Sequence, residues 1–134
     1  MSLANAEHFN QKASTYDAGT EQRRFTAELQ AHLRSIASWL GLDTSNKTGV
    51  KVLDYACGPG AAAFALHDYA GTVLGVDISE NMVSVFNERA EKAGLEHMHA
   101  IEGNLCVSED APISTLDSIT STFQGSVSSN YFCH

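Results

Sequence analysis

Short apolar runs alternate with helix-forming segments through the middle of the chain, and this alternation constrains the fold more than any other feature of the sequence. The apolar runs lie at residues 50–53, 72–76 and 97–101. Helix-forming segments lie between them, at residues 61–69 and 80–93. Strand, helix, strand, helix and strand with short connections is typical of a parallel sheet with right-handed crossovers. We therefore predict an α/β fold, in which a Rossmann-like parallel sheet is flanked by helices.

A helical segment is expected ahead of this sheet. Apolar residues recur there at intervals of three or four and form one stripe, which predicts a helix over residues 21–40. Gly41 should end this helix in a left-handed conformation, and the polar residues 43–49 should form a loop. We assign residues 1–48 to an N-terminal helical lid or cap segment. The stripe consists of Phe25, Leu29, Leu33, Ile36 and Leu40.

The regular pattern stops after Leu105. Residues 106–134 contain seven serines and three threonines, no Lys or Arg, and no sustained helical or strand period. A doubly wound sheet needs more strands than the three identified, so we expect the sheet to be incomplete at its C-terminal end. Residues 49–105 are then a cofactor-binding Rossmann-like half-domain, and residues 106–134 are a divergent tail. The alternative is an irregular β element over residues 113–132.

A glycine turn, Cys-Gly-Pro-Gly at residues 57–60, connects the first strand to the next helix. Gly58 and Gly60 let the backbone approach a ligand because no Cβ stands in the way. The next strand ends at Asp77, where a carboxylate can accept two hydrogen bonds from a ribose. Asp77 could instead cap the following helix, but Ser79 already suits that position. The pattern therefore indicates a nucleotide site at the carboxyl ends of the first two strands.

Two cofactor classes fit the spacing of this turn. Gly58-x-Gly60-x-x-Ala63, with Asp77 nineteen residues beyond Gly58, also matches a dinucleotide pattern. Asp54, which ends the first strand, separates the two classes. Its carboxylate would repel the pyrophosphate of a dinucleotide and would attract the cationic amine and sulfonium of S-adenosylmethionine. We therefore expect S-adenosylmethionine as the cofactor, with a simple turn role for Asp54 as the alternative.

The same segments resemble class I S-adenosylmethionine-dependent methyltransferases of the small-molecule type. Residues 52–60 are similar to the first motif of this family, residues 75–82 to the second, and residues 102–105 to the third. Residues 9–17 resemble the lid segment that many small-molecule members carry ahead of the sheet. The resemblance covers roughly residues 8–105. It implies a Rossmann-like fold and methyl transfer by direct displacement at the sulfonium carbon.

The resemblance also implies roles for individual residues. Asp54 and the two glycines would hold the methionine portion of the cofactor, and Asp77 would bind the ribose hydroxyls. Ile78 and Met82, which follow the second strand, would pack on the adenine, unless they are ordinary core residues. Asn104 would contact the adenine amine, Leu105 would close over the ring, and Tyr16 would cover the methyl end. The complete implied set is Tyr16, Asp54, Gly58, Gly60, Asp77, Ile78, Met82, Asn104 and Leu105.

Two aromatic residues near these motifs are expected to stay outside the site. Phe9 should anchor the lid segment, and His67 should be a solvated histidine because no suitable partner is evident. We name no catalytic residue, since any general base would come from beyond the third strand, and we name no metal ligand.

Charge and cysteine content narrow the partners. The formal net charge is -8, and every Lys or Arg lies at or before Lys92, so nucleic acid is not an expected partner. The longest apolar run, residues 61–66, is far short of the roughly twenty residues that span a membrane, so no membrane association is expected. Three cysteines without a C-x-x-C pair suit a reducing compartment, which predicts a cytoplasmic location.

The expected function is therefore methyl transfer from S-adenosylmethionine to a small-molecule acceptor. Two alternatives stay open, a non-catalytic interaction module derived from a methyltransferase and an NAD-binding oxidoreductase. If the tail supplies no fourth strand, the first strand becomes an exposed edge, through which a homo-oligomer could form. In that case one wall of the cofactor cleft is also absent, and this chain alone could be inactive.

Overall fold

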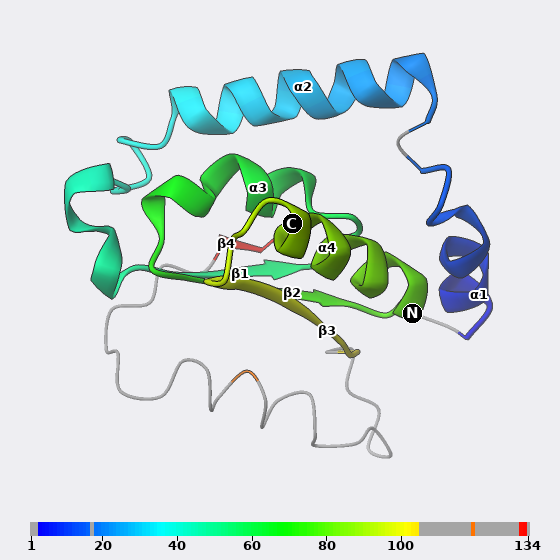
Figure 1. Cartoon of the computed structure of the whole chain (residues 1–134). Coiled ribbons are helices and arrows are strands. Elements are labelled where there is room, and N and C mark those ends of the chain that lie inside the picture. The colour runs from blue at the N-terminus through cyan, green and yellow to red at the C-terminus, as the bar shows by residue number, and fades with distance from the viewer. Residues whose placement is uncertain (1–2, 17, 105–118, 120–131, 134) are drawn as a thin grey trace.

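The computed structural model describes residues 3–16, 18–104, 119 and 132–133 of the chain. Within these residues, three helical segments come before the sheet (Figure 1). They are α1 (Leu3–Lys12), α2 (Thr20–Ser35) and the 3₁₀ helix η1 (Thr44–Gly49). The sheet and its connections follow as β1 (Lys51–Tyr55), α3 (Ala61–Leu66), the 3₁₀ helix η2 (His67–Tyr69), β2 (Thr72–Asp77), α4 (Glu80–Lys92), β3 (Met98–Glu102) and β4 (Phe132–Cys133). The expected alternation of strands and helices is therefore present from β1 to β3.

The strands form one parallel sheet in the order β3-β2-β1-β4. Asp54 of β1 lies opposite Gly75 of β2. Asp77, the last residue of β2, lies opposite Glu102 of β3. The carboxyl ends of β1 and β2 therefore meet at one edge of the sheet, beside α1 (Figure 1). This arrangement confirms the predicted Rossmann-like parallel sheet with flanking helices.

The short strand β4 covers part of the outer edge of β1. It pairs in parallel with Asp54 and Tyr55, on the side of β1 away from β2. The fully open edge that we considered from the sequence is therefore closed at these two residues. The remainder of the predicted tail, at residues 106–118, 120–131 and 134, lies outside the described residues. Most of the alternative β element over residues 113–132 lies outside them as well.

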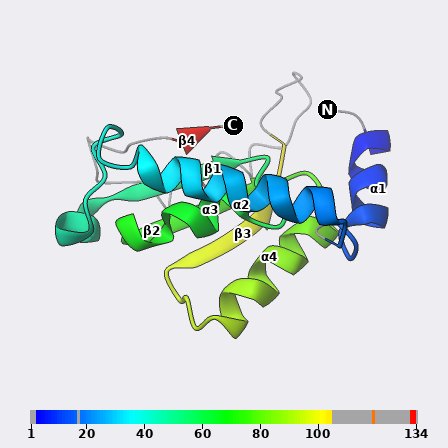
Figure 2. The same ribbon diagram turned by 90° about the horizontal axis from the view of Figure 1, so that it is seen from above.

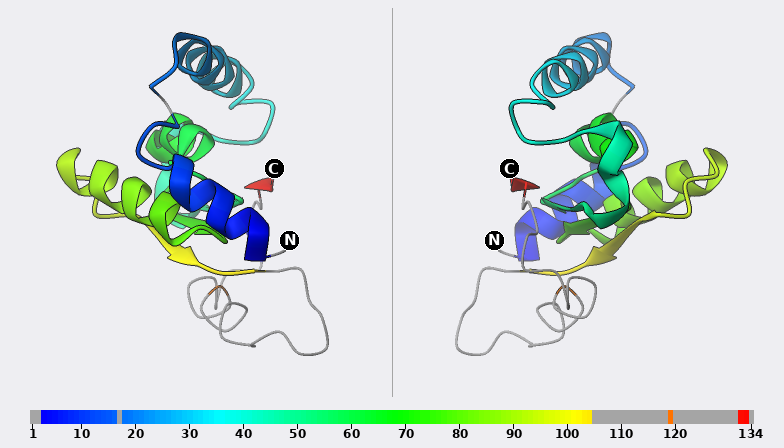
Figure 3. Two further views of the ribbon diagram at one scale, coloured as in Figure 1. Left: turned by 90° about the vertical axis from the view of Figure 1, so that its right-hand side faces the viewer. Right: turned by 90° about the vertical axis from the view of Figure 1, so that its left-hand side faces the viewer.

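The connecting helices α3 and α4 cover the same face of the sheet, and α2 lies along the outer side of α3 (Figures 2 and 3). The chain steps from β1 to β2 and from β2 to β3 in the same direction, so two right-handed crossovers put both helices on one side. The side chain of Gln30 donates to the Ala61 carbonyl at 3.0 Å. Arg34 donates to the Ala65 carbonyl at 3.1 Å, so two hydrogen bonds hold α2 on α3.

Apolar side chains are buried on both faces of the sheet. The cluster on the other face contains Leu53, Leu74 and Val76, with Tyr55, Ile101 and Ile119 against it. The cluster on the helix side contains Val52, Cys57, Ala63, Ala70, Val73, Phe86, Ala90, Met98 and Ala100. Because side chains alternate along a strand, Asp54 points to the same side as Val52. The Asp54 carboxylate therefore faces the helices.

The second helix ends earlier than predicted. α2 stops at Ser35, whose hydroxyl donates to the His32 carbonyl at 2.7 Å, a local bond that competes with continuation of the helix. A separate turn follows, closed by a 2.9 Å hydrogen bond from the Leu42 N–H to the Ala37 carbonyl. Gly41 does adopt the left-handed conformation, with a φ of +77°, but it ends this turn and not the helix.

Three further expectations about the helices are corrected. The polar stretch at 43–49 is not a loop, because Thr44–Gly49 form η1, whose cap is the Asp43 carboxylate. The helix expected at 61–69 ends at Leu66 and continues as the 3₁₀ turn η2. Phe25 is 59% exposed, because the six residues of α3 cannot cover the whole length of the 16-residue α2. Within the described ranges, no helix combines the length and apolar character that a membrane span requires.

Candidate functional site

The loop between β1 and α3 contains three residues with left-handed backbone. The φ angles are +59° at Ala56, +52° at Gly58 and +103° at Gly60. A Cβ on Gly58 would meet no heavy atom within 4 Å, so this glycine borders open space. A Cβ on Gly60 would lie 2.6 Å from the Phe64 ring, so this glycine is packed inside the fold. The two glycines of the predicted motif therefore do different work: Gly58 faces the cavity side and Gly60 lets the loop close onto the core.

Asp77 joins this loop to the loop that follows β2. Its side chain is almost buried, with 8% exposure of the residue. One carboxylate oxygen accepts the Gly58 N–H at 2.7 Å, and the other accepts the Ser79 N–H at 2.9 Å. Ser79 in turn caps α4, because its hydroxyl accepts the Met82 N–H at 3.2 Å. A carboxylate has about four acceptor positions, so Asp77 retains capacity for a ligand.

A cavity of about 120 Å³ opens between these two loops and the N-terminal segment. Five of the residues predicted for cofactor binding line it together, from three separate parts of the chain. Phe9 also lines it, which corrects the expectation that this ring only anchors the lid. Met82 is 1% exposed, so it is a core residue and a wall of the cavity at once. The full lining is Phe9, Tyr16, Ala56, Gly58, Asp77, Ile78 and Met82.

A second cavity, of about 380 Å³, lies on the other side of the glycine loop. α2 supplies one wall through Gln22, Phe25, Thr26, Leu29 and Leu33. The loop and the start of α3 supply the rest. Tyr16, Ala56 and Gly58 line both cavities, so the two spaces adjoin beside these residues.

Asp54 and Gly60 line neither of these two cavities. Asp54 is completely buried, and its carboxylate accepts the Ala63 N–H at 3.1 Å. The expectation that this carboxylate meets a cationic group of the ligand directly does not fit its position beneath the loop. The physical reason is that the first-turn N–H groups of α3 lack partners within the helix and attract a nearby acceptor on the helix face of β1. Asp54 therefore supports the loop from below.

The last two predicted residues follow β3. Asn104 is partly buried and lines neither cavity. Leu105 lies outside the described residues. Ala56 was missed, because a left-handed alanine cannot be inferred from residue type; its position in the glycine loop was the one available signal. Phe9 was visible in the lid motif but was assigned a different role.

Cys57, in the centre of the loop, is not suited to nucleophilic chemistry. It is 4% exposed, and its backbone N–H donates to the Val76 carbonyl at 3.1 Å. Burial, with smaller contributions from the charges of Asp54 and Asp77, raises the pKa of the Cys57 thiol far above its ordinary value. The thiol therefore stays neutral and packs in the core.

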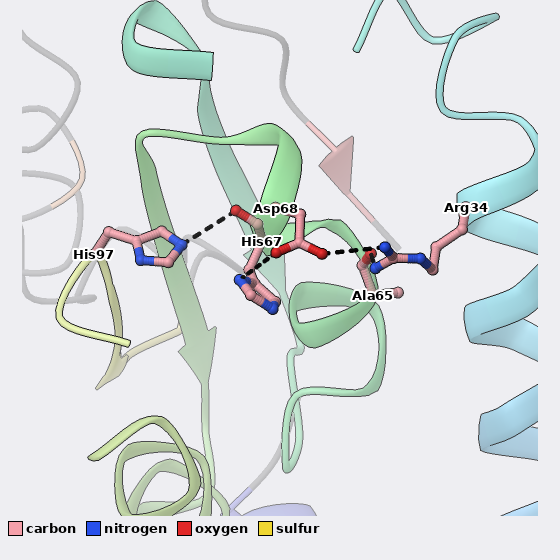
Figure 4. A network of polar contacts seen from close by, with 5 residues as sticks. All are labelled: Arg34, Ala65, His67, Asp68 and His97. Carbon is pink, nitrogen blue, oxygen red and sulfur yellow. Dashed lines mark hydrogen bonds and ion pairs between the residues drawn. The ribbon is translucent and has the colours of Figure 1, made fainter. Parts of the chain in front are cut away.

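A second polar cluster lies at the opposite edge of the sheet, where β2 and β3 begin (Figure 4). The His67 ring is 3.5 Å from the Asp68 carboxylate, which pairs with Arg34 at 3.1 Å. The His97 ring lies against His67 and contacts its carbonyl at 3.1 Å. His67 is thus half-buried between Asp68 and His97, which corrects its expected role as a solvated histidine. Burial is the main cause that lowers the pKa of His67.

The fold and the site together define a class of protein. A parallel α/β sheet with a glycine loop, a carboxylate ending the next strand and a cavity at the carboxyl ends of both strands is a Rossmann-like nucleotide-binding domain. A family model described as a methyltransferase domain matches residues 46–122, which is more than half of the chain. The chain belongs to this methyltransferase-domain family.

Individual relatives agree with this assignment. An uncharacterised methyltransferase of Schizosaccharomyces pombe is 34% identical over 74 residues, covering 52% of this chain and 26% of the relative. A demethylmenaquinone methyltransferase of Anoxybacillus flavithermus is 35% identical over 78 residues, covering 56% of this chain and 32% of the relative. The aligned part thus spans about a quarter to a third of these relatives. A solved complex of DhpI with SAM and HEP shares the fold, with a TM-score of 0.53, 24% identity, and coverage of 76% of this chain and 42% of that one.

Proposed function

We propose that this chain is the cofactor-binding part of an S-adenosylmethionine-dependent methyltransferase. The observation that carries the proposal is the position of Asp77 on the wall of a cavity that also has apolar walls. A carboxylate with free acceptor capacity suits a ribose diol, and Ile78 and Met82 beside it suit a flat base. Membership of the methyltransferase-domain family favours this cofactor over a dinucleotide.

The residue roles follow from that cavity. Asp77 binds the ribose, Ile78 and Met82 pack on the adenine, and Gly58 lets the backbone approach the methionine portion. Tyr16 stands between the two cavities and covers the methyl end. Residues 49–105 form the cofactor-binding half-domain, residues 1–48 its lid and cap, and residues 106–134 a divergent tail.

The other predicted residues take supporting or peripheral roles. Asp54 and Gly60 shape the loop without touching the cofactor, and the charge of Asp54 acts on the methionine portion only through the loop. Asn104, just beyond β3, contacts the adenine amine, and Leu105 closes over the adenine ring. These assignments extend the family motifs to positions that the two described cavities do not include.

The cofactor supplies an electrophilic methyl group on a sulfonium when it is bound. This chain's own residues bind and orient it, and much of the rate in such a displacement comes from holding the acceptor in line with that carbon. The second cavity is the candidate space for the acceptor, because it adjoins the first at Tyr16. Phe25, Leu29 and Leu33 give it an apolar wall, which suits a small organic acceptor.

The name of one relative gives demethylmenaquinone as the compound that it methylates, which agrees with a small acceptor for this chain. The net charge of -8 disfavours nucleic acid as the acceptor. The cysteine pattern favours a cytoplasmic location. Pairing of β4 with part of the outer edge of β1 disfavours a homo-oligomer through that edge.

Isothermal titration of the chain with S-adenosylmethionine and, separately, with NAD tests the cofactor. We expect heat with the first ligand only. The Asp77→Asn variant should weaken binding by tenfold or more, since hydrogen bonds to a charged group are each worth roughly 1.5–3 kcal/mol. The control is Asp68→Asn, which changes an exposed carboxylate at the opposite edge of the sheet and should leave binding unchanged.

Urea unfolding of both variants must accompany the titration, because Asp77 also bonds the Gly58 and Ser79 N–H groups. A loss of affinity in a variant that stays folded supports ribose binding. Heat with NAD alone would instead support an oxidoreductase. Heat with neither ligand would support a non-catalytic interaction module.

A further inference from the structure

The lid helix α1 is hydrogen-bonded to the amino end of α4 through one residue, Asn10, by its side chain and its backbone carbonyl. The side-chain oxygen of Asn10 accepts the Ser79 hydroxyl at 2.6 Å and the Asn81 N–H at 3.1 Å. The Asn81 side chain donates in return to the Asn10 backbone carbonyl at 2.8 Å. These bonds connect residues about seventy positions apart in the sequence. Asn10 takes part in all three bonds.

The direction of the Ser79 bond is fixed by chemistry. The Asn10 side-chain oxygen can only accept, and it also accepts the Asn81 N–H, so the Ser79 hydroxyl must donate its proton to it. The Asn81 N–H is one of the first-turn donors of α4 that have no partner within the helix. Ser79 therefore satisfies one of these donors, and Asn10 satisfies another from a different helix. The Asn81 N–H therefore has this acceptor only when α1 is docked.

The same contact lies next to the proposed nucleotide cavity. Phe9, adjacent to Asn10 in the sequence, lines the cavity from the lid side, and Asp77 lines it from the sheet side. Asp77 accepts the N–H of Ser79, the residue that Asn10 holds through its hydroxyl. Figure 3 shows α1 lying across the ends of the strands at which this cavity opens. Docking of Asn10 therefore fixes the lid wall of the cavity relative to the sheet wall.

We propose that Asn10 is a positioning residue that latches the lid helix over the nucleotide cavity. Opening of the lid requires the two bonds to its side-chain oxygen to break, so this oxygen sets the rate at which a bound nucleotide leaves. The inference rests on the proposed function for the identity of the nucleotide. The latch itself makes a prediction that needs no ligand.

Three variants distinguish the effect of the acceptor oxygen from the effect of side-chain size. Asn10→Asp keeps an acceptor for both bonds, and its charge is compatible with a helix N-terminus. Asn10→Leu keeps the approximate size and removes the acceptor. Gln11→Ala, at an exposed position of the same helix, is the matched control. All three are compared with the unchanged chain.

The ligand-free readout is hydrogen exchange of the Asn81 amide measured by NMR. The Val83 amide, which donates within α4 to the Ser79 carbonyl, reports any general loosening of the helix. We expect Asn10→Leu to speed Asn81 exchange about tenfold relative to Val83, which corresponds to one or two net hydrogen bonds. In Asn10→Asp and Gln11→Ala, the exchange rate of Asn81 relative to Val83 should stay within about twofold of its value in the unchanged chain.

The ligand readout is the dissociation rate of S-adenosylmethionine, measured by stopped flow. We expect Asn10→Leu to raise this rate about tenfold and Asn10→Asp to restore it. Faster exchange without faster dissociation would overturn the latch, as would equal effects of the Leu and Asp variants. If the unchanged chain binds no S-adenosylmethionine, the proposed function fails, and the exchange of Asn81 still decides whether Asn10 holds the lid.

Discussion

Alanine substitution should separate the two glycines of the loop into one that serves binding and one that serves folding. Both Gly58 and Gly60 have positive φ, so alanine at either position is strained by about 1–2 kcal/mol. Part of this strain, roughly 0.4–1 kcal/mol, is offset because alanine restricts the unfolded chain. At Gly58 the new Cβ meets no atom within 4 Å, so nothing further is added. We expect Gly58→Ala to lower the free energy of unfolding by about 1 kcal/mol.

Alanine at Gly60 should also destabilise the fold through a steric clash. Its Cβ would lie 2.6 Å and 2.7 Å from two atoms of the Phe64 ring and 2.9 Å from the Phe86 ring. Phe86 is fully buried, so its ring cannot simply move into solvent. Overpacking of this kind costs about 1–3 kcal/mol. The total expected for Gly60→Ala is therefore about 2–4 kcal/mol.

Gly60→Ala should be the less stable variant, but Gly58→Ala should bind the cofactor more weakly. Gly58 lines both cavities, so its methyl group would occupy ligand space, and we expect S-adenosylmethionine to bind about tenfold more weakly, or about 1.4 kcal/mol. Gly60 lines neither cavity, so the folded fraction of Gly60→Ala should bind nearly as well as the unchanged chain. Gly41→Ala is the control for strain alone, because Gly41 has a φ of +77° and open space around its Cβ.

Urea unfolding gives the stabilities, provided that the slope of each curve is unchanged, and isothermal titration gives the affinities. Equal destabilisation of Gly58→Ala and Gly60→Ala would refute the steric argument. Unchanged affinity of Gly58→Ala, in a chain that binds the cofactor, would refute the assignment of Gly58 to the ligand side of the loop.

Three other predictions follow from the same structure. Because the pKa of His67 is lowered in the fold from 6.5, its neutral form is favoured, so the free energy of unfolding should fall as the pH drops through that value. Urea titrations from about pH 7.5 to about pH 5.5 should show this slope, and His67→Gln should reduce it. Cys57 should resist iodoacetamide in the native chain and react after unfolding, as peptide mass spectrometry would show; rapid native labelling would contradict its burial. Ala56→Gly should change stability by less than about 1 kcal/mol, since relief of left-handed strain opposes the added freedom of the unfolded chain; a larger loss in urea unfolding would mean that the methyl group packs more tightly than its partial burial suggests.

Much of the fold could be predicted because its signals are local. The three strands and the helices between them were visible as apolar runs and helical periods, and β2 ends at Asp77 as expected. Ser79 also caps α4 as expected, through a bond of 3.2 Å. The ends of the helices could not be predicted as well. The stop at Ser35 depends on a side-chain hydrogen bond, and the exposure of Phe25 depends on how far α3 reaches beneath α2.

The candidate site could be predicted only in part, for a geometric reason. The motif indicates which residues lie near the loop, but not on which side of it each side chain points. Asp54 and Asp77 occupy corresponding ends of adjacent strands, yet one is sealed beneath the loop and the other reaches the cavity. The strand register explains the difference. Asp54 lies opposite Gly75, and Asp77 comes two residues after Gly75, so it lies further toward the carboxyl end of the sheet.

This offset gives the two carboxylates complementary tasks in a single loop. Asp54 accepts the Ala63 N–H from below, and Asp77 accepts the Gly58 N–H from the side. Acidic side chains therefore hold the middle of the loop and the first turn of α3, which follows it, without a ligand. A loop fixed in this way loses little conformational entropy on binding, which favours affinity. The sequence predicts direct ligand contact for the Asp54 carboxylate, whereas the structure places it beneath the loop, bonded to a backbone N–H.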